Sequence, residues 1–152
     1  MHRGEELMAR RSNVSIKVDV KGFCEGMDMD LKKLQVLMPK TMARIGASME
    51  NYAKAKVRVD TGHLQRSITH MEYNDSLRFH TYVGTAVHYG PYQEYGTGDR
   101  GSNEYNGHIE PLVTFTAGWP GMTGQPYLRP ALYDMEAYHV SLVRQCFREA
   151  VR

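Results

Sequence analysis

Cysteine is scarce in this chain. Only Cys24 and Cys146 occur among 152 residues, and they lie far apart in the sequence. No CxxC pair is present, so the spacing typical of zinc ribbons and of thiol–disulfide redox sites is missing. Cys146 falls on the apolar stripe of an expected C-terminal helix, which predicts a buried free thiol. A reducing compartment is therefore expected.

The residue patterns of common catalytic and metal sites are also missing. The seven histidines show no HxxxH or HExxH spacing, and the two on a predicted β-hairpin, His70 and His80, are expected on opposite faces. No GxSxG, no P-loop and no usefully spaced pair of carboxylates occurs. We therefore expect no catalytic residues, no metal, no cofactor and no enzymatic activity.

Long apolar runs and strong charge are the remaining absences. No run approaches the roughly 18 apolar residues that a transmembrane helix needs, and "MHRGEELMARR" lacks the apolar core of a signal peptide. A net charge of +2 is too small to indicate a nucleic-acid binder. Arginines gather near both ends of the chain, where solvated termini are expected: Arg3, Arg10, Arg11, Arg144, Arg148 and Arg152.

The composition indicates an ordinary globular protein. Hydrophobic residues make up 41% and charged residues 24% of the chain, which argues against global disorder. The length predicts a single domain over residues 1–152. Within it we expect a flexible N-terminal arm at 1–12 and a long, partly disordered loop at 96–124, which is dense in Gly, Asn, Ser, Asp and Pro. A long loop of this kind is usually functional.

Hydrophobic periodicity predicts the main elements. Residues 13–20 alternate between apolar and polar, as in a half-buried strand. An apolar stripe over 31–52 indicates helix, which Pro39 is expected to divide into a short helix ending near Met38 and a longer one. A final helix is expected over 130–151, a helical turn or two from Pro91, and a further strand at 109–118.

A β-hairpin is predicted from two strand-like segments that flank Asn74 and Asp75. If these two residues form the loop, Ile68 faces Thr81. One side of the hairpin then faces the core with Ile68, Leu77, Phe79 and Val83. The expected fold is α+β, with a small, mostly antiparallel sheet packed against a long central helix and a C-terminal helix.

The tripeptide Asp60, Thr61 and Gly62 matches the signature of aspartic peptidases, in which two such loops share a proton. Those loops sit at the tips of buried strands, whereas here the polar end of a helix precedes the tripeptide and helix-compatible residues follow. We expect Asp60 or Thr61 to cap a short helix, Gly62 to allow a sharp turn, and Leu64 to enter the core. A homodimeric aspartic peptidase remains an alternative.

The segment "GTGDRG" at 96–101 matches GxGxxG but lacks the preceding strand and following helix of a dinucleotide site. Tyrosines cluster nearby, as is typical of protein interfaces: Tyr89, Tyr92, Tyr95 and Tyr105. Base stacking would need a basic groove, and Arg100 is the only Lys or Arg between Arg78 and Arg129. Protein contact is favoured, with a DNA-binding accessory module as an alternative.

Three segments in this order resemble one family: "AKVRVDTGHLQRSI", "YVGTAVHYGPYQEYGTG" and "FTAGWPGMTGQPYLRPAL". They are similar to the head–tail joining proteins of long-tailed bacteriophages, the neck or tail-completion proteins also described as minor tail components. The resemblance covers about residues 38–151. His63 and Gln65 depart from it, because a basic residue is frequent at both positions in the family, and the insert at 96–124 is longer than in compact members.

The resemblance implies a structural virion protein that assembles as a ring, with six subunits expected, around the channel for DNA. It would bridge a head-completion or portal-side protein to a tail terminator or tail tube protein, with no membrane contact, after assembly in the host cytoplasm. The residues expected to hold the fold are Asp60, Thr61, Gly62, Leu64, Ser67, Pro126, Leu128, Arg129 and Pro130. Those expected to contact other subunits or partners are Tyr89, Tyr92, Glu94, Tyr95, Gly96, Thr97, Tyr105 and Trp119.

Overall fold

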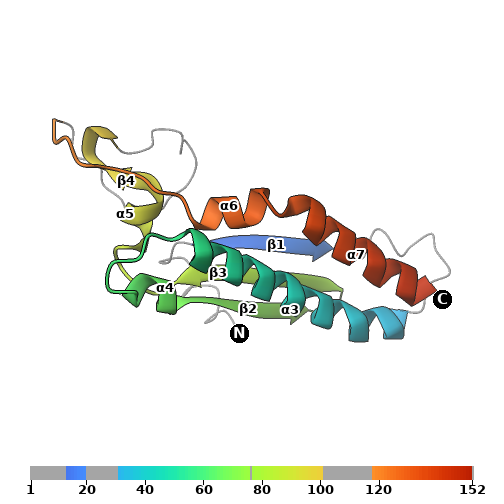
Figure 1. Cartoon of the computed structure of the whole chain (residues 1–152). Helices are drawn as coiled ribbons and strands as arrows, with labels where there is room; N and C mark the ends of the chain where they lie inside the picture. Colours follow the sequence, from blue (N-terminus) through green and yellow to red (C-terminus); the bar gives the residue numbers. More distant parts are fainter. Residues whose placement is uncertain (1–12, 20–30, 76, 101–117, 152) are drawn as a thin grey trace.

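The computed structural model describes residues 13–19, 31–75, 77–100 and 118–151 (Figure 1). Four sequence predictions concern residues outside these ranges: the flexible N-terminal segment at 1–12, Cys24, Tyr105 and nearly all of the strand at 109–118. The elements run in the order β1 (Asn13–Asp19), α3 (Leu31–Lys56), α4 (His63–Ser67), β2 (Ile68–Asp75), β3 (Arg78–Thr85), α5 (Gly90–Tyr95), β4 (Gly96–Thr97), η1 (Gly98–Arg100), β5 (Met122–Thr123), α6 (Leu128–Tyr133) and α7 (Glu136–Val151).

The fold is α+β, as the sequence predicts. Three antiparallel strands form a sheet in the order β1-β3-β2, with β3 at its centre. Helix α3 packs across β2 and β3, α6 lies against β1, and α7 runs beside α3 (Figure 1). The core lies between these layers and is built from Leu34, Met42, Ile45, Met49, Phe79, Val83, Leu142 and other buried side chains.

Helix α3 runs without a break from Leu31 to Lys56, so the predicted division at Pro39 is wrong. The proline ring removes the N–H that would bond to the carbonyl of Gln35. Gln35 is exposed, so water can solvate that carbonyl. Leu34 and Met42 are fully buried on either side of the proline. Their burial holds both halves of the helix on the same core.

The hairpin forms with a different register from the predicted one. Ile68 pairs with Thr85 instead of Thr81, and Asp75 pairs with Arg78, so Asn74 and Asp75 belong to the strand. A slip of four residues keeps every side chain on its predicted face, because side chains alternate with a period of two. Phe79 and Val83 accordingly lie in the core, as predicted.

The predicted single C-terminal helix is instead two helices, α6 and α7, separated at Asp134 and Met135. At this break the Tyr52 hydroxyl of α3 donates a hydrogen bond of 2.5 Å to Asp134 Oδ2. The apolar stripe that predicted burial of Cys146 is confirmed on α7, where Cys146 and His139 are both buried. Cys146 is a buried free thiol, as expected, and burial raises its pKa.

Candidate functional site

The Asp-Thr-Gly tripeptide forms the corner between α3 and α4, where Asp60 and Thr61 are exposed and Gly62 is buried. Gly62 adopts the left-handed conformation, with φ at 73°, as its predicted role in a sharp turn requires. The N-cap of α4 is Gly62, so the expectation that Asp60 or Thr61 occupies that position is wrong. The Thr61 hydroxyl does accept a hydrogen bond from the His63 N–H at 3.4 Å, and Leu64 is buried. Asp60 lies on the surface of a helix–helix corner, which differs from the buried strand tip of an aspartic peptidase.

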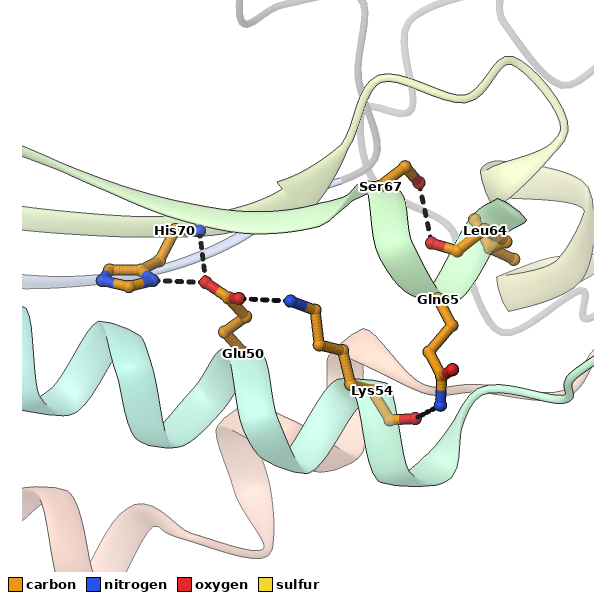
Figure 2. Close-up of polar contacts among 6 residues, drawn as sticks. All are labelled: Glu50, Lys54, Leu64, Gln65, Ser67 and His70. Atoms are coloured by element: carbon orange, nitrogen blue, oxygen red, sulfur yellow. Dashed lines mark hydrogen bonds and ion pairs between the residues drawn. The ribbon is translucent and has the colours of Figure 1, made fainter. Parts of the chain in front are cut away.

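Hydrogen bonds and ion pairs connect α4 and β2 to the C-terminal part of α3 (Figure 2). Gln65 Nε2 donates to the Lys54 carbonyl at 2.8 Å, one of the last carbonyls of the helix. The Glu50 carboxylate accepts from the His70 backbone N–H at 3.0 Å and also bonds the His70 ring and Lys54 Nζ. Burial raises the pKa of Glu50, but these partners together outweigh burial and lower it.

Ser67 completes this corner. Its hydroxyl donates to the Leu64 carbonyl at 2.7 Å and lies 2.5 Å from the Thr85 hydroxyl on β3 (Figure 2 shows the Leu64 bond). Ser67 thus links the short helix α4 to the sheet.

A second structural unit extends away from the sheet and helices, and we call residues 90–100 and 118–126 the arm (Figure 1). Its two chain segments are joined by the pairing of β4 with β5, in which Gly96 lies opposite Thr123. Gln125 N–H also donates to the Gln93 carbonyl at 2.7 Å. The ends of the long predicted loop are therefore held together.

Glycine is required where the arm segments cross. Gly121 has φ at 57°, and a Cβ there would lie 1.8 Å from the Thr97 carbonyl oxygen. Gly98 is equally constrained, because its Cβ would lie 2.2 Å from the Trp119 carbonyl oxygen. Larger residues at these positions would force the two segments apart.

The arm is anchored by the buried carboxylate of Glu94. Oε2 accepts hydrogen bonds from the backbone N–H groups of Tyr127 at 2.7 Å and Leu128 at 2.9 Å. Oε1 accepts from Arg129 N–H at 3.0 Å and from Arg129 Nε at 3.1 Å. A carboxylate here satisfies the otherwise unpaired N–H groups of the first turn of α6 and interacts favourably with the helix dipole.

The position of Glu94 corrects one expectation. The side chain is only 1% exposed and is bonded within its own chain, so an expected partner contact does not fit it. Tyr95 is also buried, with the Arg129 guanidinium 4.8 Å from its ring centroid. No pattern in the sequence indicates this carboxylate's partners, because they follow it by 33 to 35 residues.

The arm also carries exposed apolar side chains. Trp119 is 53% exposed and Met122 is 44% exposed, and Tyr89, which directly precedes α5 and the arm, is 36% exposed. Met122 is not among the expected contact residues, and its two-residue strand gives no periodic signal. Of the other expected contact residues, Tyr92 and Thr97 are partly buried and Gly96 is buried.

The expected fold-holding segment at 126–130 lies at the root of the arm. Leu128 is buried, Arg129 bonds to Glu94, Pro130 is partly buried in α6, and Pro126 is exposed. Segments 89–97 and 126–131 therefore come together as one unit, although a long loop separates them in the sequence.

Within the described ranges, no three His, Cys, Asp or Glu side chains gather closely enough to hold a metal ion. The helices in the same ranges include none long and apolar enough to cross a membrane. Comparison of the chain with protein-family models, curated proteins and solved structures gives no match.

Proposed function

We propose that this chain is a structural protein of a tailed-phage virion that joins head and tail, a neck or tail-completion component acting as a connector. The observation that carries the proposal is the joining of segments 89–97 and 126–131 around Glu94. They lie within two of the three segments on which the resemblance rests. Their contact gives the resemblance a physical basis, since both segments build the root of one arm.

The arm is suited to contact with another protein. It presents Trp119 and Met122 as exposed side chains, and Tyr89 is exposed directly before it. Exposed aromatic and Met side chains are typical of interface centres. Its root is fixed by buried hydrogen bonds, so little conformational entropy is lost on docking. An arm that contacts a different surface on its neighbour makes a heterologous interface, which closes into a ring when the rotation permits.

In this proposal the ring has six subunits and surrounds the channel through which DNA passes. One face docks to a head-completion or portal-side protein, and the other docks to a tail terminator or tail tube protein. The protein is then found in the virion neck. Docking of a rigid arm provides the function by geometry, with no chemical step.

The proposal is tested by native mass measurement over a range of protein concentrations. The unaltered chain should form a discrete oligomer, and Trp119→Ser and Tyr89→Ala should raise the concentration needed by about tenfold, as expected for central interface residues. Tyr138→Ala is the matched control, because Tyr138 is an exposed aromatic residue on α7, outside the arm. A strict monomer at every concentration, even with head-side and tail-side neighbours added, would contradict the proposal.

A further inference from the structure

Helix α3 exposes a row of side chains along the first half of its length. Lys32, Val36, Lys40 and Arg44 follow one another at intervals of four residues, and all four are exposed. Residues four apart on an α-helix are neighbours on its surface. These side chains therefore form one continuous ridge about 18 Å long, which we call the basic ridge.

The basic ridge carries positive charge that the described part of the protein does not neutralise. None of its three cations forms an ion pair with a described residue. No carboxylate occurs in α3 before Glu50, and Glu50 is already bonded to Lys54 and His70. Lys40 and Arg44 are one helical turn apart, where like charges repel. A negatively charged partner would relieve this repulsion.

An exposed apolar side chain lies among these charges. Val36 is 59% exposed and lies between Lys32 and Lys40 on the ridge. A row of nucleic-acid phosphates would leave Val36 without an apolar contact, whereas a partner protein can bury it. An apolar centre with a polar rim is typical of protein interfaces. The basic ridge therefore fits an acidic protein surface better than it fits a nucleic acid.

We propose that the basic ridge binds an acidic helix of a partner protein, which lies antiparallel along α3. This helix carries carboxylates at intervals of four residues, with one apolar residue among them that packs on Val36. Each carboxylate reaches one cation, so the charges of the two helices are complementary along the ridge. In the antiparallel orientation the C-terminal end of the partner helix, the negative end of its dipole, lies beside Lys32. The contact goes beyond the proposed function, because it needs neither the arm nor a ring.

The probe is an alanine-based helical peptide in which every fourth position holds, in order from the N-terminus, glutamate, glutamate, leucine and glutamate. This order places the leucine opposite Val36 when the peptide lies antiparallel to α3. Titration followed by heteronuclear NMR measures the binding. We expect saturable shifts that are largest at residues 32–44. The affinity should fall at least tenfold in the double variant Lys40→Glu and Arg44→Glu.

The matched control is Lys17→Glu with Arg58→Glu, which makes the same change in charge at an exposed lysine and an exposed arginine outside the ridge. Circular dichroism and thermal midpoints establish that both double variants are folded. Equal loss of affinity in the two would reduce the contact to general charge attraction and overturn the proposal. A peptide with the order glutamate, leucine, glutamate, glutamate matches the ridge only in parallel, and its equal or tighter binding would overturn the antiparallel arrangement.

Two other occupants are distinguished by the same titration. Saturation of the shifts at 32–44 by a DNA duplex at lower concentration than the peptide would assign the ridge to nucleic acid and overturn the proposal. Self-association that is lost in the Lys40→Glu and Arg44→Glu variant would assign it to a second copy of the chain and overturn it too. A chain that binds the peptide but stays monomeric would contradict the ring and support the ridge contact, and a ring that ignores the peptide would do the reverse.

Discussion

Arg129 and Glu94 are joined by a hydrogen bond of 3.1 Å between Nε and the carboxylate Oε1, although 35 residues separate them in the chain. Nη2 of the same arginine donates to the Glu94 backbone carbonyl at 3.3 Å. The guanidinium also lies over the Tyr95 ring. The Arg129 side chain, at the start of α6, thus contacts α5 at the Glu94 carboxylate, the Glu94 carbonyl and the Tyr95 ring. These contacts attach the arm to α6.

Replacement of Glu94 by Gln should lower the free energy of unfolding by about 2–3 kcal/mol, because a buried charged acceptor is lost. Both carboxylate oxygens face N–H donors. Gln offers one acceptor oxygen and turns an NH₂ group toward the remaining donors. Urea denaturation measures the change. Glu149 lies on the exposed face of α7. Glu149→Gln should therefore change stability by no more than about 0.5 kcal/mol, and a similarly small value for Glu94→Gln would refute this role.

Glu94 and Arg129 should also be energetically coupled. A double-mutant cycle with Glu94→Gln and Arg129→Met should give a coupling free energy of about 1–3 kcal/mol, as for residues in one buried network. The exposed pair Gln145 and Glu149, 2.8 Å apart, serves as the control and should couple by less than about 0.5 kcal/mol. Additive effects at Glu94 and Arg129 would show that the two side chains act separately.

Gly121→Ala should open the arm while leaving the sheet and helices folded. The added methyl carbon would lie 1.8 Å from the Thr97 carbonyl oxygen, so β4 and β5 must separate. Limited proteolysis within the arm should accelerate by at least about tenfold, because local opening governs cleavage. Gly118→Ala is the matched control: Gly118 also has positive φ, at 81°, but a Cβ there meets no atom of the described residues within 4 Å. Equal cleavage of both variants would argue against the crossing as the cause.

His139 should make stability fall as the solution becomes acidic. Burial lowers the pKa of His139 below its ordinary value of 6.5, and its Nε2 lies 3.0 Å from the Ser48 hydroxyl. Below pH 6.5 the unfolded chain therefore binds the proton more readily than the folded chain. The contribution is fully present above pH 6.5 and is lost progressively as pH falls through the lowered folded pKa.

Denaturation of the unaltered chain and of His139→Gln over this range measures that contribution. The variant should lose less stability on acidification, since Gln does not titrate. Parallel stability curves for the two proteins would contradict the buried-neutral assignment of His139.

The sequence predicts the helices and strands of this fold better than it predicts the strand register and the break between α6 and α7. Periodicity alone finds β1 and the stripe of α3, because each has one buried side, and Pro91 marks the start of the short helix α5. The register of β2 and β3 could not be decided in this way, since a slip of four residues exposes the same faces. At the break between α6 and α7, Asp134 accepts a hydrogen bond from the hydroxyl of Tyr52, which lies 82 residues away in the sequence.

At the candidate site, too, local sequence patterns do not indicate contacts between residues that lie far apart in the chain. The tyrosines and the 126–131 segment mark the arm in the sequence, but the role of Glu94 does not follow from its neighbours. A carboxylate among tyrosines is an ordinary surface pattern, and only the fold brings the start of α6 to it.

Negative-stain imaging of the concentrated protein tests the central claim most directly. The account predicts closed rings with a central channel, with six subunits expected, which become rare when Trp119 is replaced by Ser. Particles that remain single subunits, alone and in mixtures with head-side and tail-side neighbours, would contradict it.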